Sequence, residues 1–189
     1  MKKIIAGVDE VGRGSLVGPV YAAAVIIKKI DKKRLKDSKK LSKKNREILN
    51  YYIKKNCIWA IASASIREIE KHNILNASLL AMKRAIIKLK KKPQLVLVDG
   101  NKLPKINNYN LKNIIKGDQK IPAISAASII AKVSRDRLVS KMSKNFKKYL
   151  WNKNSGYGTK DHIRAIKKFG ITKYHRKTFN PVHNILSPE

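Results

Sequence analysis

Short apolar runs, separated by charged or glycine-rich segments, are the feature that most limits what this chain can fold into. Runs rich in Ile, Val and Ala predict strands at residues 4–8, 20–27 and 57–64. A stretch with apolar residues at helical spacing then precedes a fourth predicted strand at residues 94–98. Three strands close together in sequence favour an antiparallel meander, and the helix allows a crossover that sets the fourth strand parallel to another. We therefore expect an α/β fold with a mixed sheet flanked by helices.

The second half of the chain predicts fewer strands. A short fifth strand is expected at residues 114–116, and a helix with many small residues at residues 125–149. Neither an internal repeat nor a low-complexity linker separates two units. We therefore expect residues 1–189 to form a single domain, with residues 151–189 as a C-terminal appendage of helix and loop on the same core.

Acidic residues stand directly after three of the predicted strands. Asp9 and Glu10 follow the first strand, Asp99 follows the fourth, and Asp118 follows the fifth. Because the carboxyl ends of strands share an edge in a largely parallel arrangement, we expect these side chains to meet there. Successive strand residues point to opposite faces, so the first strand must twist or end at this point if both of its acids are to serve one site.

Carboxylates that meet at one edge repel one another. Two like charges about 4 Å apart repel by on the order of 4 kcal/mol at an effective dielectric constant near 20. Such a cluster must take up protons or bind cations, and an all-oxygen ligand set favours Mg²⁺ or Mn²⁺ over Zn²⁺. Two such ions can hold the attacking and leaving oxygens of a phosphoryl displacement. One acid alone would more simply be a helix cap or half of a surface ion pair, but three strand ends with the same pattern favour a metal site.

A glycine-rich segment and the net charge both indicate a phosphodiester substrate. Gly12 and Gly14 flank Arg13, so the backbone there can approach a ligand closely. The chain has 44 Lys and Arg residues against 12 acids, a formal net charge of +32, and a polyanionic partner is the first interpretation. The abundance of Ile, Lys and Asn also fits A·T-rich coding DNA, so part of the surplus is solvated surface.

Cysteine content and hydropathy limit the cellular compartments in which the protein is expected. Cys57 is the only cysteine, which excludes a disulfide within the chain and a cysteine-based zinc site. The longest apolar runs reach about eight residues, far below the roughly 20 that a membrane-spanning helix needs. We expect a cytoplasmic monomer without membrane contact.

Taken in order along the chain, these residues and several further motifs resemble the ribonuclease HII family. The matching motifs are Gly7-Val8-Asp9-Glu10-Val11-Gly12-Arg13-Gly14, Gly18-Pro19-Val20, Asp37-Ser38-Lys39-Lys40-Leu41-Ser42, Val98-Asp99-Gly100-Asn101, Gly117-Asp118, residues 124–133, Arg135-Asp136, Gly156-Tyr157-Gly158-Thr159, His162, His175-Arg176, Phe179 and Pro181-Val182. Any one of these pieces is a weak signal. The full set in order, across nearly the whole chain, is a strong one.

The resemblance implies a ribonuclease H-like fold and metal-dependent endonucleolytic cleavage of RNA in RNA–DNA hybrids. It also implies incision on the 5′ side of single ribonucleotides embedded in duplex DNA. A metal-activated water would attack the phosphate and leave 3′-hydroxyl and 5′-phosphate ends. The implied cofactor is Mn²⁺ or Mg²⁺, and the implied catalytic metal ligands are Asp9, Glu10, Asp99 and Asp118.

The resemblance also implies how substrate is bound. Backbone groups of the glycine-rich segment would read the ribose 2′-hydroxyl, the feature by which a protein tells RNA from DNA without reading a base. An aromatic residue would stack on the neighbouring deoxyribose, and two lysines would lie near substrate phosphates. Carried over to this sequence, these substrate-binding residues are Gly12, Arg13, Gly14, Tyr157, Lys39 and Lys40.

Some alternatives stay open at the level of sequence. Ser15 and Ser155 depart from the family pattern, in which proline and lysine are frequent at these positions. A non-catalytic basic binder, such as a ribosome-associated protein, would also explain the charge. A relative of the same fold with another phosphodiester substrate, such as branched DNA, would share the acids. The sequence leaves open whether the protein binds a replication clamp.

Overall fold

The computed structural model describes residues 3–31, 35 and 41–187. Within these residues, strands come first and helices dominate the later part of the chain. The elements in order are β1 (Ile5–Val11), β2 (Val20–Ile27), α1 (Lys43–Asn56), β3 (Cys57–Ala64), α2 (Ile66–Ile87), β4 (Leu95–Asp99), β5 (Leu111–Ile114), α3 (Gly117–Lys120), α4 (Pro122–Ser143), a 3₁₀ helix (Lys147–Tyr149), α5 (Trp151–Asn154), α6 (Lys160–Phe169) and α7 (Val182–Leu186).

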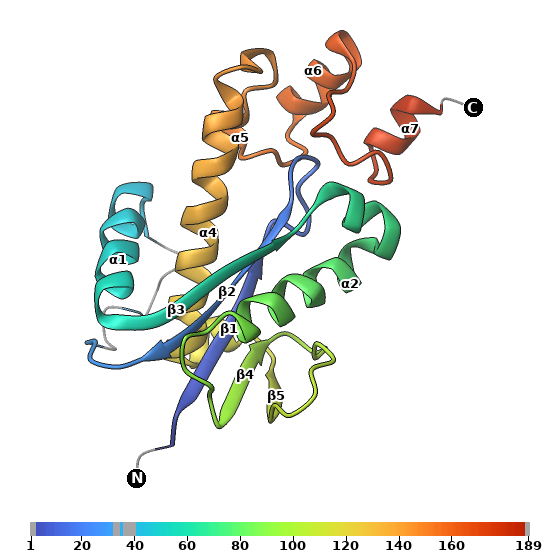
Figure 1. The fold of residues 1–189 in the computed structure, drawn as a ribbon. Coiled ribbons are helices and arrows are strands. Elements are labelled where there is room, and N and C mark those ends of the chain that lie inside the picture. Colours follow the sequence, from blue (N-terminus) through green and yellow to red (C-terminus); the bar gives the residue numbers. More distant parts are fainter. Residues whose placement is uncertain (1–2, 32–34, 36–40, 188–189) are drawn as a thin grey trace.

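The five strands form one mixed sheet in the order β3-β2-β1-β4-β5 (Figure 1). The first three strands pair antiparallel, and β4 and β5 run parallel to β1. Helix α2 makes the crossover that returns the chain to the β4 position. The predicted combination of an antiparallel meander with parallel strands is therefore confirmed.

Three predicted boundaries are wrong. Strand β1 does not end before the acids, because β2 is long enough to continue the ladder as far as Val11. The fifth strand is Leu111–Ile114, not residues 114–116, because its position is set by pairing with β4 and not by local hydrophobicity. Helix α4 starts earlier and stops at Ser143, and the chain then turns through a separate 3₁₀ helix instead of continuing to residue 149.

Each face of the sheet carries its own apolar cluster. Alternate residues of β1, β2 and β4 pack against α2 on one face. The other residues of β2, together with β3, pack against α1 and α4 on the opposite face. Gly7 allows α4 to lie directly on β1, since a Cβ atom at this position would come within 2.2 Å of the backbone of Ala123. The N-terminal half of α4 is thereby held against the strand that carries Asp9.

The C-terminal part of the chain packs against the start of the molecule. A third apolar cluster joins Trp151, Ile166 and Val182 to Leu16 and Val17, which lie between β1 and β2. In Figure 1 the segments α5 to α7 accordingly gather at the end of the molecule where β1 and β2 are connected. This arrangement places residues from both ends of the sequence around the glycine-rich segment.

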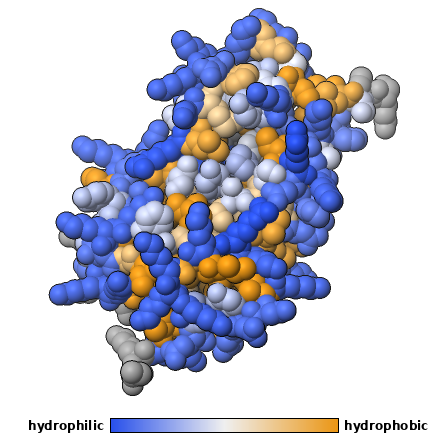
Figure 2. All heavy atoms as spheres, viewed as in Figure 1, coloured by the Kyte–Doolittle hydropathy of each residue, from blue (hydrophilic) through white to orange (hydrophobic). Residues whose placement is uncertain are grey.

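The surface is strongly polar on the face that Figure 2 shows, with hydrophilic side chains projecting over most of it. Smaller apolar areas lie between them. Within the described ranges, no helix is both long and apolar enough to cross a membrane.

Candidate active site

The acids of β1 lie on opposite sides of a regular strand. Asp9 is paired in register with Ala23, which packs on the α4 side of the sheet, and Glu10 is paired with Ala22, which packs on the α2 side. Asp9 is buried, and its carboxylate accepts the N–H of Glu10 at 2.7 Å. The side chain of Ser128 on α4 also hydrogen-bonds to Asp9. Asp9 is thus fixed against α4, while Glu10 stays more accessible.

The sheet opens at these acids. The parallel pairing of β1 with β4 ends at Val8 and Val98, so Asp9 and Asp99 each follow the last paired residue of their strand. The two strands therefore present their acids side by side at the same edge. The register of β1 and β4 thus brings Asp99 beside the first acids, and a shared site for these residues stays a prediction.

Asp118 is tied to the same edge through the backbone. Asp99 Oδ1 accepts the N–H of Gly117 at 2.6 Å, and Asp118 follows in the first turn of α3. Asp118 is buried. The hydrogen bond joins the end of β4 to the segment that leads into α4, so the fourth acid is positioned by the third.

The carboxylates of Asp9, Glu10 and Asp99 are close enough to repel. Burial raises the pKa of Asp9 well above its ordinary value, and the charges of Glu10 and Asp99 raise it further. Burial also raises the pKa of Glu10; the neighbouring Arg13 opposes this effect, and the charge of Asp99 adds to it. The Arg13 Nη1 atom lies 3.3 Å from Glu10 Oε1. Among the described residues, the repulsion between these acids is thus only partly offset by Arg13.

The donor chemistry of these side chains, rather than their arrangement in this structure, suits a divalent cation with oxygen ligands. Among the residues that the structure describes, no group of three or more His, Cys, Asp or Glu side chains is arranged so that it could hold a metal ion. The carboxylates thus lie within electrostatic reach without forming a ready-made ligand set. Their donor atoms are all oxygens, which Mg²⁺ and Mn²⁺ prefer as ligands. A bound cation would also offset the cost of burying these negative charges and the repulsion between them.

The glycine-rich segment is held open by buried arginines. Gly12 has a φ of +91°, and a Cβ atom there would come within 2.2 Å of Arg135 Nε, so only glycine fits. Arg176 Nη1 donates to the carbonyl oxygen of Arg13 at 2.9 Å. Gly14 is exposed, with no atom within 4 Å of where its Cβ would lie. A backbone surface is therefore presented to solvent next to Glu10.

Ser15 connects this segment to the loop that carries Tyr157. Its side chain is buried, and Ser15 Oγ lies 2.9 Å from the carbonyl oxygen of Gly156 and 3.1 Å from that of Val17. The backbones of Ser15 and Tyr157 also form an isolated antiparallel bridge. The serine that departs from the family pattern thus fastens two candidate substrate-binding loops together.

Tyr157 is fixed by its backbone and flanked by cations. Its carbonyl oxygen bonds to His162 Nδ1 at 2.9 Å. Lys132 Nζ lies 5.8 Å from the centroid of the Tyr157 ring, and Arg135 Cζ lies 5.6 Å from it. The ring is only partly buried. The structure therefore brings Tyr157 to the glycine-rich segment.

Sequence reasoning missed the residues that support the site. Arg135 and Arg176 are fully buried and donate to backbone carbonyl oxygens around the glycine-rich segment. Arginine is seldom buried without a carboxylate partner, so the sequence gave no reason to predict that these two would be buried. Only the Arg135-Asp136 and His175-Arg176 motifs drew attention to them. Lys39 and Lys40, predicted to lie near substrate phosphates, fall outside the described residues.

Comparison with known proteins gives a consistent result. The family model described as ribonuclease HII matches residues 6–182. The chain is 71% identical to ribonuclease HII of Pelagibacter ubique (strain HTCC1062), over 97% of this chain and 100% of that protein. Its fold matches the crystal structure of ribonuclease H2 from Pyrococcus horikoshii OT3 with a TM-score of 0.81 and 27% identity, over 96% of each chain. It also matches ribonuclease HII of Archaeoglobus fulgidus, solved in a complex with PCNA, with a TM-score of 0.72 and 28% identity, over 93% of this chain and 95% of that one. With its acids gathered at one sheet edge and its sequence matched along almost its full length, the chain belongs to the ribonuclease HII family.

Proposed function

We propose that Asp9, Glu10, Asp99 and Asp118 are the metal-binding catalytic acids of this ribonuclease HII. As a member of the family, the protein is an endoribonuclease that acts on RNA–DNA hybrids. The observation that supports the residue assignment is the electrostatic coupling of three of these acids at the edge where β1 and β4 part. Asp118 is included because it is buried and its segment is bonded to Asp99.

The family depends on divalent metal ions, and we propose Mg²⁺ or Mn²⁺ for this chain. When bound, such ions supply positive charge to the phosphate under attack and to the leaving oxygen. The residues of the chain contribute the rest. Ser128 and the N–H of Glu10 orient the carboxylate of Asp9. The N–H of Gly117 orients that of Asp99. These acids would hold the ion, because a cation would relieve the repulsion between them.

Substrate selection is assigned to the glycine-rich segment and Tyr157. The exposed backbone at Gly14 is able to hydrogen-bond a ribose 2′-hydroxyl without contacting a base, so cleavage depends on the sugar and little on sequence. Tyr157, bridged to Ser15, stacks on the adjoining deoxyribose. Arg13 is exposed beside Glu10, where it neutralises part of the acidic charge. This division of roles favours incision 5′ of a single ribonucleotide in duplex DNA.

We further propose that the protein works as a cytoplasmic monomer in which residues 1–189 act as one domain. The packing of the C-terminal segment against Leu16 and Val17 supports the single domain, since residues from both parts build the same loop cluster. Binding to a replication clamp is supported by the Archaeoglobus fulgidus relative, which was solved with PCNA. Size-exclusion chromatography with light scattering, with and without a purified clamp, tests both assembly proposals.

The decisive test of the proposed function uses three duplexes of the same sequence. One has a single ribonucleotide, one has a full RNA strand opposite DNA, and one is all DNA. With Mg²⁺ or Mn²⁺ we expect a cut on the 5′ side of the single ribonucleotide, cleavage throughout the RNA strand, and no cut in the DNA control. Binding without any cleavage under either ion contradicts the proposal and leaves a basic nucleic-acid binder. Cutting of branched DNA regardless of the 2′-hydroxyl would instead indicate a different phosphodiester substrate.

A further inference from the structure

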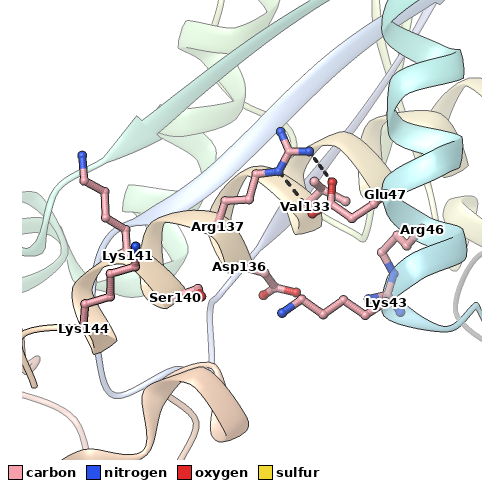
Figure 3. Close-up of a pocket in the computed structure, with 9 residues that line it drawn as sticks. All are labelled: Lys43, Arg46, Glu47, Val133, Asp136, Arg137, Ser140, Lys141 and Lys144. Carbon is pink, nitrogen blue, oxygen red and sulfur yellow. Dashed lines mark hydrogen bonds and ion pairs between the residues drawn. The ribbon is translucent and has the colours of Figure 1, made fainter. Parts of the chain in front are cut away.

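A basic groove lies between α1 and α4, outside the candidate active site. It has a volume of about 440 Å³, and the nine residues that line it are drawn in Figure 3: Lys43, Arg46, Glu47, Val133, Asp136, Arg137, Ser140, Lys141 and Lys144. Five of the nine are cations, and Val133 is the single apolar residue among them. The groove therefore has the composition of a site for a polyanion.

The carboxylates in the groove are already neutralised. Glu47 pairs with Arg137 across the groove, from α1 to α4 (Figure 3). Asp136 accepts from Lys132 Nζ at 2.8 Å. Within the part of the chain that the structure describes, Lys43, Lys141 and Lys144 form no ion pair. Their charges are therefore available to an external anion.

The spacing of the cations fits a line of phosphates better than one compact anion. Arg137 and Lys141 lie on α4 and Lys144 is the residue that caps its C-terminus, and seven residues at the rise of a helix span roughly 10 Å. Ser140 adds a hydroxyl donor between them. A nucleic-acid backbone presents its charges in such a line, whereas protein–protein interfaces rely on apolar or aromatic anchors, which this groove lacks.

The groove and the candidate active site lie along the same helix, α4. Helix α4 carries Ser128, which bonds to Asp9, and Lys132, which lies beside Tyr157 and pairs with Asp136 at the near end of the groove. At 1.5 Å per residue, Asp136 and Lys144 are about 12 and 24 Å beyond Ser128 along the helix axis. One duplex lying along α4 reaches both places.

We propose that the groove between α1 and α4 binds the phosphate backbone of the duplex about 4 to 7 base pairs from the cleaved bond. The distance follows from the helix rise and a rise of about 3.4 Å per base pair. This inference rests on the proposed function, because the active site supplies its reference point. The groove increases affinity for duplex of any sequence and takes no part in the chemistry.

The first experiment measures binding without cleavage. The variant Lys43→Glu/Lys141→Glu reverses one exposed cation from each wall of the groove. The matched control Lys90→Glu/Lys91→Glu changes the net charge equally at exposed positions before β4, at the edge of the sheet opposite the acids. Fluorescence anisotropy with an all-DNA duplex of about 24 base pairs should show roughly tenfold weaker binding for the groove variant, with a log–log salt slope lowered by about 2. The control should change less than about twofold.

Equal losses in the two variants overturn the proposal, because they would reflect net charge alone; no loss in the groove variant overturns it as well. Circular dichroism melting of both variants establishes that each is folded. The conservative variant Lys43→Gln/Lys141→Gln should show a smaller loss of the same kind, since it removes charge without reversing it.

The second experiment locates the contact. Neutral methylphosphonates replace single phosphates on either side of one ribonucleotide. For the wild-type chain, KM should rise when the neutral linkage lies about 4 to 7 base pairs from the ribonucleotide. The groove variant should show no further rise there, which is the signature of a direct pair in a double-mutant cycle. A rise that persists unchanged in the groove variant overturns the assignment. If the protein cleaves none of the duplexes but the binding result is obtained, the proposed function is contradicted and the proposed role of the groove in binding duplex is still supported.

Discussion

Asp99 Oδ1 and the backbone nitrogen of Gly117 are 2.6 Å apart. Asp99 is the last residue of β4, and its carboxylate therefore anchors the segment that carries Asp118 to the end of that strand. The hydrogen bond requires an acceptor oxygen but not a negative charge. This separates the structural role of the residue from its proposed catalytic role, because an amide can keep the first and lose the second.

Asp99→Asn should abolish cleavage while leaving the fold and duplex binding intact. The amide oxygen of Asn can still accept the N–H of Gly117, but it binds a divalent cation much more weakly than a carboxylate. We expect the cleavage rate to fall by a factor on the order of 10² or more, with the dissociation constant for duplex changing little. Asp161→Asn, which removes an exposed acid paired with Arg164 on α6, is the control and should cleave normally. Cleavage by Asp99→Asn at the normal rate would remove the residue from the site.

Stabilisation by metal ions should increase with pH. The folded pKa of Asp9 is raised, so in metal-free protein its contribution to stability is fully present below the ordinary value of 3.8 and is lost as the pH rises through the raised folded value. A divalent cation competes with that proton and replaces it at high pH. At about 100 times its dissociation constant, the ion should add about 3 kcal/mol. Thermal melts at pH 5 and pH 8, with and without Mg²⁺ or Mn²⁺, should show the larger shift at pH 8.

Asp9→Asn provides the comparison for that measurement. The variant removes the buried titrating group and part of the repulsion with Glu10. Its metal-free stability at pH 8 should equal or exceed that of the wild-type chain, and its metal-induced shift should be small at both pH values. A metal-induced shift that is unchanged in this variant would place the cation elsewhere.

Tyr157→Ala should impair incision at a single ribonucleotide more than cleavage of a long hybrid. Only the former substrate requires one junction to be positioned, and the ring that would stack there is presented between the cations of Lys132 and Arg135. We expect a loss of about 1–3 kcal/mol of stacking, or roughly 5- to 150-fold in kcat/KM, on the single-ribonucleotide duplex. Tyr157→Phe keeps the ring and should retain most activity. Equal losses on both substrates would indicate that Tyr157 is purely structural.

Ser15→Ala should loosen the connection between the two loops. The buried hydroxyl lies 2.9 Å from the carbonyl oxygen of Gly156, and its removal leaves that contact unmade. We expect a decrease of about 1 kcal/mol in the free energy of unfolding, measured by urea titration, and poorer discrimination between ribonucleotide and deoxyribonucleotide. Ser187→Ala, at an exposed position, is the control. If stability falls but discrimination does not, the hydroxyl has no part in selecting the sugar.

Acid should destabilise the segment that positions Tyr157. His162 Nδ1–H donates to the Tyr157 carbonyl, and His162 Nε2 accepts from Trp151 and faces His175 Nε2 at 3.3 Å. Burial lowers the pKa of both histidines, that of His175 to about 4. The contribution of His175 is therefore fully present above its ordinary pKa of 6.5 and is lost as the pH falls toward about 4. The fluorescence of Trp151 should report the loss, because its indole ring packs edge-on against the ring of His175, with the two centroids 5.5 Å apart.

His175→Gln isolates this effect. Glutamine can still donate a hydrogen bond toward His162 but does not titrate. We expect lower stability at neutral pH, because a buried ring is lost, and a shallower decline in the free energy of unfolding between pH 6.5 and about 4. An unchanged pH slope would show that the acid sensitivity arises from other groups.

Much of the sheet follows from local pattern, and the exceptions have a physical cause. Strands β2 and β3 match the predicted boundaries because polar or turn-forming residues bound their apolar runs: Pro19 and Lys28 flank β2, and Asn56 and the N-cap residue Ser65 flank β3. Strand β5 contains Lys112 and Asn113 between two apolar residues, so only its pairing with β4 makes it a strand. Strand β1 continues beyond the acids because its partner does, which no local pattern in β1 indicates.

The candidate site likewise has features that could be predicted from the sequence and features that could not. The acids and the glycine-rich segment can be predicted because strand ends and glycines have local signatures. Their supports cannot, because Arg135 and Arg176 each donate to an acceptor more than a hundred residues away, the carbonyls of Val17 and Gly18 respectively. A buried arginine has no periodicity of its own, and its role is visible only when the chain has folded.

The reliance of the glycine-rich segment on Arg176 has a consequence for the order in which the enzyme is made. All four acids and α4 precede Arg176 in the sequence, so a ribosome adds them before it adds the guanidinium that donates to the carbonyl of Arg13. The growing chain therefore holds its proposed metal ligands before it holds the side chain that fixes the glycine-rich segment.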